Sequence, residues 1–267
     1  NSTFSSVRFS NIISGQIPEI EQTVNIVLYE GLMDESIGRG AYMAVSPDFF
    51  EMFPCRFIAG SHDALEDVSN VIITESMAEK FGGKDALGKD FHINTDRYTI
   101  GAIIEDQMYS IFDSRYKVFV SLEHPDFAFF KNTDEYQGAA DGNTLTFHKV
   151  RKGADVGEIR RKINEINDSY LIRDEDKGKE LYTLTRLDKL YFSDSNQGLG
   201  LKRGNAKMMM AFSIIALFIL ISAIFNYVNL STALAGKRSK EMATRMLLGD
   251  SRLKVMGIYI KESLLMT

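Results

Sequence analysis

Cysteine, histidine, proline and tryptophan are scarce in this chain of 267 residues, which has one Cys, four His, four Pro and no Trp. The single cysteine, Cys55, cannot form a disulfide within the chain, and no catalytic-cysteine signature surrounds it. The four histidines, at positions 62, 92, 124 and 148, lie far apart and lack the spacing of paired metal ligands. We therefore expect a buried thiol at Cys55, and no metal site, cofactor site or catalytic site.

The stretch FGGKDALGKD, residues 81–90, has the glycines and lysine of a phosphate-binding loop but the wrong surroundings. Such a loop leads from a strand into a helix, whose N-terminus then receives the phosphate. Here residues 75–81 predict a helix before the glycines, and residues 91–104 predict strand after them. Asp90 also stands where Ser or Thr would hold magnesium. We expect a C-cap glycine followed by a turn, so any ATP is handled elsewhere.

One long hydrophobic run, residues 208–230, contains no charged residue, no Gly and no Pro. At about 1.5 Å per residue it can cross a hydrocarbon core of roughly 30 Å. A buried core helix is the alternative, but such helices are usually shorter and carry a polar stripe. Residues 207–231 are therefore predicted to be a transmembrane helix in a lipid bilayer.

Charge changes sign at this run. Residues 207–267 carry eight Lys or Arg against three Asp or Glu, a net charge of +5, and the remaining 23 basic and 33 acidic residues give residues 1–206 a net charge of −10. The basic excess after the run predicts a cytoplasmic C-terminal side and an extracytoplasmic acidic part. The acidic balance of that part argues against nucleic acid as a partner.

The two ends of the sequence predict a piece of a longer protein. It begins without Met or a signal peptide and stops in a second apolar stretch, so we expect an upstream transmembrane helix and at least three spans in the parent. The expected organisation is an extracytoplasmic domain, a transmembrane helix, a cytoplasmic coupling segment and the start of the next transmembrane helix, at residues 1–206, 207–231, 232–254 and 255–267.

The extracytoplasmic part is predicted to be an α+β domain. Strands are expected near residues 25–30, 71–73, 91–104, 116–122 and 144–150, and an amphipathic helix at 154–168. Residues 19–24 are expected to be a helix end, and 129–143 and 193–205 a polar loop and a linker. We expect two subdomains, one inserted in the other, with residues 1–42 and 145–192 packing together in the membrane-proximal half.

The segment that follows the hydrophobic run resembles the FtsX-like core of MacB/FtsX-type ABC transporter permeases. That family pairs an N-x-x-N-L helix end with a basic R-x-K-E segment and a later E-S-L-L. Ala243, Met246 and Asp250 depart from its usual residues. The positions that match the pattern are Asn226, Asn229, Leu230, Arg238, Lys240, Glu241, Arg245, Leu248, Gly249, Ser251, Arg252, Glu262, Ser263, Leu264 and Leu265.

The upstream part resembles the extracytoplasmic MacB-like domain of the same family. The stretches VSPDFFEMFPCRFIAG, NVIITESMAEKFGGKDALGKDF and YTIGAIIED occur in the order that the family shows. The resemblance covers nearly the whole chain and is weakest over residues 1–40 and 121–143.

The resemblance implies a permease subunit without its own catalysis, in the bacterial inner membrane with residues 1–206 in the periplasm. Its expected partners are a cytoplasmic ABC ATPase and a second permease copy or half, and in efflux systems a periplasmic adaptor and an outer-membrane channel. The coupling helix is expected at residues 239–248. The ATPase-coupling residues are predicted to be Arg238, Lys240, Glu241, Met242, Arg245, Met246, Leu247, Leu248 and Gly249.

Three classes of function follow. The first is a permease that couples ATP hydrolysis to efflux or export of an amphiphilic drug, peptide or lipoprotein. The second is an extracytoplasmic sensor or mechanotransmission domain of a membrane signalling protein, and the third is a membrane-anchored enzyme. Two further membrane helices downstream favour the first class, whereas a kinase-like or cyclase-like domain there removes it.

Overall fold

The computed structural model describes residues 6–34, 37–106, 111–128, 144–170, 178, 182–193, 200–202, 204–251, 253–254, 257 and 261. The chain forms two units, Asn1–Gly204 and Asn205–Thr267, and each is described by itself. The predicted polar loop at 129–143 lies outside the described residues, as does most of the predicted linker at 193–205.

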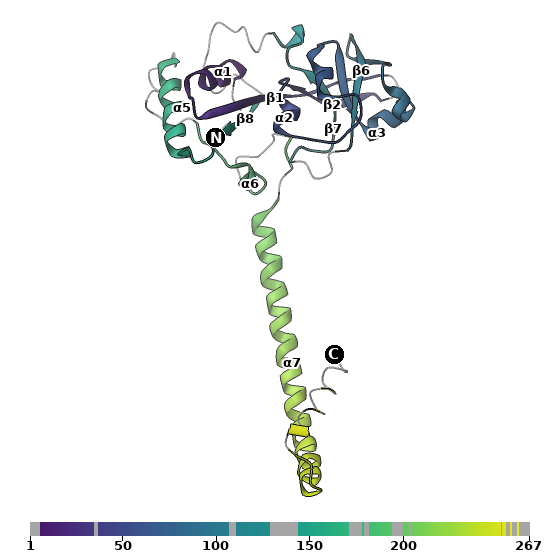
Figure 1. Ribbon diagram of the computed structural model, residues 1–267, viewed down its shortest axis with the longest axis vertical. Coiled ribbons are helices and arrows are strands. Elements are labelled where there is room, and N and C mark those ends of the chain that lie inside the picture. Colours follow the sequence, from purple (N-terminus) through teal and green to yellow (C-terminus); the bar gives the residue numbers. More distant parts are fainter. Residues whose placement is uncertain are drawn as a thin grey trace. The chain divides into compact units, whose positions relative to one another are not determined.

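The first unit is built on one mixed sheet of eight strands (Figure 1). The sheet order is β3-β6-β4-β7-β2-β1-β8, with β5 also paired to β6. The pairs β2–β7 and β4–β6 are parallel, and the other pairs are antiparallel. The strands are β1 (Ile20–Leu32), β2 (Arg39–Val45), β3 (Phe57–Ala59), β4 (Asn70–Thr74), β5 (Asp90–Ile93), β6 (Asp96–Ile104), β7 (Tyr116–Ser121) and β8 (Thr144–Val150). The mixed sheet with helices agrees with the predicted α+β class.

Short helices and two longer ones complete this unit. The 3-10 turns are η1 (His62–Glu66), η2 (Glu79–Phe81), η3 (Gly83–Ala86) and η4 (Pro125–Phe127), and the α-helices are α1 (Val7–Gln16), α2 (Phe49–Met52), α3 (Glu75–Ala78), α5 (Val156–Tyr170) and α6 (Leu187–Leu190). Helix α5 matches the predicted amphipathic helix. Its Ile159 and Ile163, one turn apart, are buried against Phe9, Ile13 and Ile17.

The first and last segments of the unit pack together, as the sequence predicts. Strand β1 pairs with β8, and α1 and α5 lie side by side at this end of the sheet (Figure 1). The division into two subdomains is not confirmed, because β1 continues without a break from its pairing with β8 to its pairing with β2. The predicted helix end at residues 19–24 is wrong. Pairing with β8 makes this segment strand from Ile20 onward, and such tertiary contacts override local propensity.

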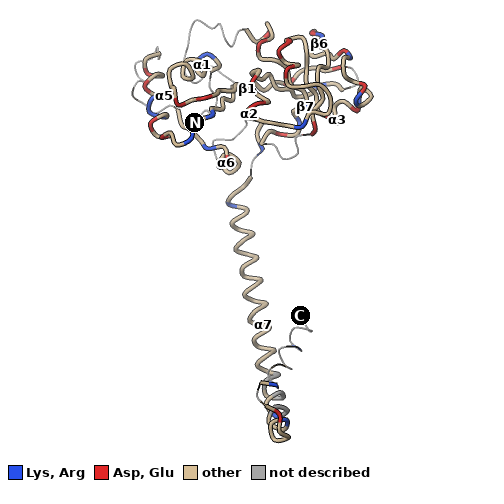
Figure 2. Tube along the Cα trace, in the orientation of Figure 1, with Lys and Arg blue, Asp and Glu red and all other residues tan. Residues whose placement is uncertain are grey.

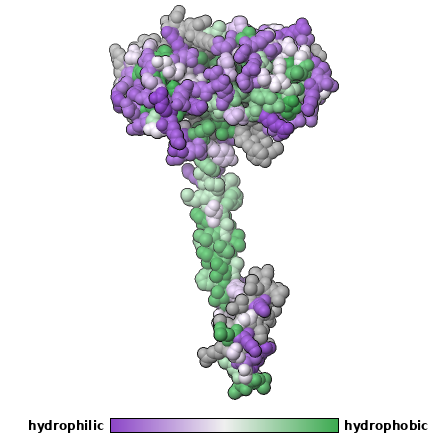
Figure 3. Space-filling view, in the orientation of Figure 1, coloured by the Kyte–Doolittle hydropathy of each residue, from purple (hydrophilic) through white to green (hydrophobic). Residues whose placement is uncertain are grey.

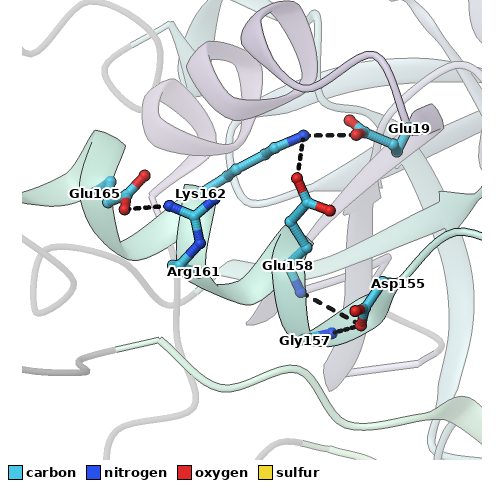
Figure 4. A network of polar contacts seen from close by, with 7 residues as sticks. All are labelled: Glu19, Asp155, Gly157, Glu158, Arg161, Lys162 and Glu165. Carbon is cyan, nitrogen blue, oxygen red and sulfur yellow. Dashed lines mark hydrogen bonds and ion pairs between the residues drawn. The ribbon is translucent and has the colours of Figure 1, made fainter.

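A polar network ties α5 to the start of β1 (Figure 4). The Lys162 ammonium donates to Glu19 Oε1 at 2.6 Å and lies 3.3 Å from Glu158 Oε1. This hydrogen bond lowers the pKa of the Glu19 carboxyl below its ordinary value. Asp155 Oδ1 accepts from the N–H of Gly157 at 2.8 Å and so satisfies a free donor at the start of α5. The network fixes the register of α5 on the sheet more than it adds stability, because exposed ion pairs contribute little.

The glycine-lysine stretch at residues 81–90 forms the predicted cap and turn. Gly82 has a φ of 97°, the left-handed conformation that ends a helical segment, and β5 begins at Asp90. The Lys89 ammonium donates to the carbonyl oxygen of Phe81 at 2.7 Å, and the Gly88 N–H donates to the Ile100 carbonyl at 2.8 Å. Since strand follows the loop, no helix N-terminus is available for a phosphate.

The stability of this unit should fall in mild acid because of His148. This partly buried side chain has its Nδ1 2.8 Å from Thr23 Oγ1, and burial lowers its pKa to about 4 from an ordinary value of 6.5. Below pH 6.5 the unfolded chain takes up a proton that the folded chain refuses until about pH 4. The free energy of unfolding is therefore highest above pH 6.5 and falls by on the order of 2 kcal/mol as the pH approaches 4.

Thermal unfolding of the wild type and of His148→Gln, at neutral pH and near pH 4, measures this effect. We expect the variant to lose less stability than the wild type on acidification, because glutamine has no proton to take up. His62→Gln changes an exposed histidine and is the matched control. Equal losses in wild type and His148→Gln would contradict the assignment.

The second unit contains one long helix, α7 (Ala206–Leu247), of 42 residues. The Asn205 side chain begins it by accepting the N–H of Met208 at 3.0 Å. The part Ala206–Ala233 is long and apolar enough to cross a membrane. The predicted boundary between residues 231 and 232 is no break in the helix. Ala, Leu, Lys, Arg, Glu and Met dominate the residues that follow, and such strong helix formers let the helix continue to Leu247.

Candidate coupling site at the end of helix α7

The nine predicted coupling residues lie at the C-terminal end of α7. Positions 238–247 form its last turns, Leu248 is the C-cap and Gly249 follows it with a φ of 99°. The structure describes the side chains of Lys240, Arg245, Met246, Leu247 and Leu248, while those of Arg238, Glu241 and Met242 lie outside the described set. The structure therefore brings the predicted residues into one continuous helical segment and not into a separate coupling helix.

Backbone hydrogen bonds fix how this segment ends. The Asp250 N–H donates to the Arg245 carbonyl at 3.1 Å, and the Gly249 N–H donates to the Met246 carbonyl at 3.2 Å. These two bonds and the left-handed glycine form a Schellman motif, which closes a helix and turns the chain away. The sequence LLGD encodes the motif, since glycine adopts positive φ without steric cost. Helical conformation resumes at Leu253 and Lys254.

An exposed leucine cluster surrounds this turn, consisting of Leu247, Leu248 and Leu253, which are 88%, 82% and 78% exposed. Met246, one residue earlier, is 39% exposed. Single exposed leucines are common, but three within seven residues of chain are typical of a surface that docks on something. The sequence analysis named Leu247 and Leu248 and missed Leu253, whose position just beyond the glycine turn was the available signal.

Basic residues flank the leucine cluster. Lys240 is exposed and Arg245 is partly exposed in the helix, and exposed Lys254 follows the turn. Figure 2 shows charged residues gathered at this end of α7, while the middle of the helix carries none. The arrangement offers an apolar contact surface with a positive rim, which suits a partner groove that is apolar inside and acidic at its edge.

The apolar part of α7 satisfies most of its own polar groups. Ser213 Oγ donates to the Met209 carbonyl at 2.9 Å, and Thr232 Oγ1 donates to the Val228 carbonyl at 2.8 Å. Such back-bonding lets hydroxyl side chains sit in hydrocarbon without an unpaired donor. Figure 3 shows hydrophobic residues covering this part of the helix. Its surface is thus suited to lipid or to other transmembrane helices.

The described residues offer little for chemistry in the first unit. Within them, no group of three or more His, Cys, Asp or Glu side chains is placed to hold a metal ion. Burial raises the pKa of the Cys55 thiol to about 11, so this thiol stays protonated at neutral pH and is a poor nucleophile. His62, His92 and His124 each lie beside a different aspartate, and His148 contacts Thr23.

Comparison with known families agrees with this geometry. The MacB-like periplasmic core domain family matches residues 2–166, and the FtsX-like permease C-terminal family matches residues 213–267. The chain belongs to the MacB/FtsX-type permeases, the membrane component of ABC transporters, which work with an ATPase partner. It consists of a MacB-like periplasmic domain and the beginning of an FtsX-like membrane domain. Curated proteins yield no match to the sequence.

Solved structures support the fold of the first unit. A domain of a putative permease from Porphyromonas gingivalis is 22% identical, with a TM-score of 0.54 over 66% of this chain and 76% of that one. The periplasmic region of MacB from Actinobacillus actinomycetemcomitans is 13% identical, with a TM-score of 0.45 over 62% and 73%. The extracellular domain of the noncanonic ABC-type transporter YknZ from Gram-positive bacteria is 14% identical, with a TM-score of 0.49 over 70% and 91%.

Proposed function

We propose that this chain couples a cytoplasmic ATPase to its periplasmic domain through helix α7, for efflux or export of an amphiphilic substrate across the bacterial inner membrane. The observation that carries the proposal is the unbroken run of α7 from Ala206 to Leu247. An apolar span and a basic, leucine-rich end then belong to one rod, so a displacement of one end moves the other.

The length of α7 supports a lever that extends beyond the membrane. Its 42 residues measure about 63 Å at 1.5 Å per residue, and a hydrocarbon core is about 30 Å thick. If the span Ala206–Ala233 lies in the bilayer, the remaining 14 residues project about 20 Å beyond it. That distance is enough to carry the leucine cluster past the lipid headgroups to a soluble partner.

The chemistry of the helix end favours an ATPase as that partner. The exposed leucine cluster can fill an apolar groove, and Arg245 and Lys240 can orient the helix by contacting acidic residues at the rim. Glu241 and Met242 occupy the positions one turn before Arg245 and Met246 in the helix. Closure of two ATPase subunits around ATP would then displace the helix ends and bias the domain between two states.

The direct test purifies the parent permease together with the ATPase encoded nearest to it. We expect the two to co-purify and the permease to stimulate ATP hydrolysis. Failure of both would remove the proposed coupling. It would favour the second candidate, a sensor or mechanotransmission domain, which shares the same lever but passes its signal to a different cytoplasmic module.

Topology is a separate expectation, motivated by the basic residues that follow the apolar span. We expect the first unit in the periplasm and the residues after Ala233 in the cytoplasm. In a Cys55→Ala background, an impermeant thiol reagent applied to intact spheroplasts should label Asp63→Cys and leave Ser239→Cys unlabelled until the cells are lysed. Both positions are exposed, so access to the compartment decides the result. Equal labelling before lysis would contradict the topology.

Substrate and further partners follow from the family alone. A second permease copy or half would bring two α7 helices to two ATPase subunits. A periplasmic adaptor and an outer-membrane channel would complete an efflux path, whereas their absence from the neighbouring genes would favour lipoprotein export or signalling.

A further inference from the structure

The chain returns to the surface of the first unit just before it leaves this unit for α7. Residues Ile111–Asp113 and Gly200–Lys202 lie antiparallel, with Phe112 and Leu201 as direct partners. The Asp113 N–H donates to the Gly200 carbonyl at 2.9 Å, and the Lys202 N–H donates to the Ile111 carbonyl at 2.6 Å. We call these two three-residue segments the exit clamp. The sequence predicted a linker here, and the pairing pins its last part to the domain.

Side chains anchor the exit clamp in the core. Phe112 is 5% exposed and Leu201 is 9% exposed, and both belong to the hydrophobic cluster beneath α2. The Phe112 ring stacks among other aromatics, with ring centroids 5.5 Å from Phe49 and 5.2 Å from Phe53. Leu201 therefore ties the exit segment to the aromatic core and does not merely rest on the surface.

Gly200 brings the exit segment against the centre of the sheet. Its φ is 64°, and a Cβ there would lie 2.5 Å from Tyr116 Oη and 2.8 Å from Leu28 Cδ1. Tyr116 is 6% exposed and begins β7, which lies between β4 and β2 in the sheet. A glycine is therefore required by both the backbone conformation and the close approach, and it places the exit clamp directly on the end of a central strand.

A second contact follows immediately. The Gly204 N–H donates to the Tyr191 carbonyl at 2.9 Å, and a Cβ on Gly204 would lie within 2.6 Å of the rings of Tyr191 and Phe192. Helix α7 begins at Ala206, two residues later. From Lys202 to Ala206 the chain spans at most about 14 Å, so larger displacements of the helix start must pull on the exit clamp.

We propose that the exit clamp is the element through which movement of α7 enters the periplasmic sheet, at the start of β7. This inference rests on the proposed coupling function and deepens it by naming the residues that transmit the movement. Leu201 and Phe112 act as positioning residues, because they hold the exit segment and touch neither substrate nor nucleotide.

The first test removes the anchor. Leu201→Ala is compared with Leu187→Ala, the same change at a leucine of the same unit that is 50% exposed. Both are made in the parent permease, reconstituted with its ATPase in lipid nanodiscs, and hydrogen exchange of the first unit is measured with and without ATP. We expect the ATP-dependent change in exchange to be lost in Leu201→Ala and kept in Leu187→Ala, with ATPase co-purification unchanged in both.

The second test keeps the sequence constant and switches the connection. Phe112 and Leu201 form a non-hydrogen-bonded antiparallel pair, whose Cα atoms lie about 4.5 Å apart, a separation that accepts a disulfide. The variant Phe112→Cys, Leu201→Cys, Cys55→Ala should lose the ATP-dependent response when reduced and regain it when oxidised. Exchange without ATP reports whether the domain is folded in each state.

The outcomes separate the two levels of the proposal. A wild-type complex that retains no ATPase overturns the proposed function. A complex that retains its ATPase, but shows the full ATP response in Leu201→Ala and no difference between the reduced and oxidised cysteine pair, overturns the exit clamp. A wild type that binds ATPase without any response in the first unit overturns it as well.

Discussion

Replacing Leu247 and Leu248 by aspartate is expected to abolish binding of the ATPase partner and to leave the periplasmic domain folded. Both side chains are more than four-fifths exposed, so the substitutions remove no internal packing. In a docked complex each aspartate would meet an apolar groove, and an unpaired carboxylate there costs several kcal/mol unless it protonates or reaches water. A loss of about 3 kcal/mol already weakens binding at least about 100-fold.

Two matched variants separate charge from position. Leu247→Asn removes the leucine without adding a charge and should weaken binding less than Leu247→Asp. Leu187→Asp makes the same change at an exposed leucine of the periplasmic unit and should leave binding unchanged. Charge near the helix C-terminus has its own cost of about 0.5 kcal/mol, which is too small to explain a complete loss.

Other positions in the segment grade the effect. Met246→Asp should act like the leucine variants, since Met246 lies beside them and is itself partly exposed. Charge reversal at Glu241 or Arg245 should reduce stimulated ATP hydrolysis more than binding, because rim charges orient a complex more than they stabilise it. Co-purification and stimulated hydrolysis of the reconstituted complex measure both. Full binding and stimulation in all these variants would mean that the basic segment only sets topology.

Local patterns predicted the parts of the fold whose causes are local. Alternation and turn chemistry gave the hairpin of β5 and β6, where Asn94 takes a positive φ of 54° at the turn. The spacing of Ile159 and Ile163 gave α5, and Gly82 gave the end of η2. The uncharged run gave the membrane-spanning part of α7. In each case the determining residues are neighbours in the sequence.

The parts that could not be predicted depend on contacts between distant segments. Strand β1 begins at Ile20 because β8, more than a hundred residues later, pairs with it. The exit clamp depends on Phe112 meeting Leu201 inside a stretch that is rich in glycine and serine and predicts a linker. For the coupling site, the sequence named the residues, but only the structure revealed that they continue the membrane helix without a break.

The second large effect is expected at Asn25, a buried polar residue that joins the first and last segments of the periplasmic domain. It is 3% exposed, and its Oδ1 accepts hydrogen bonds from Ser10 Oγ at 2.7 Å and Thr146 Oγ1 at 3.0 Å. These donors come from α1 and β8, so a single amide oxygen in β1 connects three elements. Asn25→Ala removes the shared acceptor and leaves a small cavity.

We expect Asn25→Ala to lower the free energy of unfolding by about 3 kcal/mol, which combines unsatisfied hydroxyls with lost packing. For a domain of this size the midpoint of thermal unfolding would fall by about 6 to 12 °C. Asn11→Ala, an exposed asparagine on α1, is the matched control and should shift the midpoint little. Asn25→Asp keeps the acceptor oxygen but buries a charge, so its loss should grow as the pH rises above the aspartate pKa. A midpoint unchanged in Asn25→Ala would mean that the contacts between α1, β1 and β8 are held by apolar packing alone.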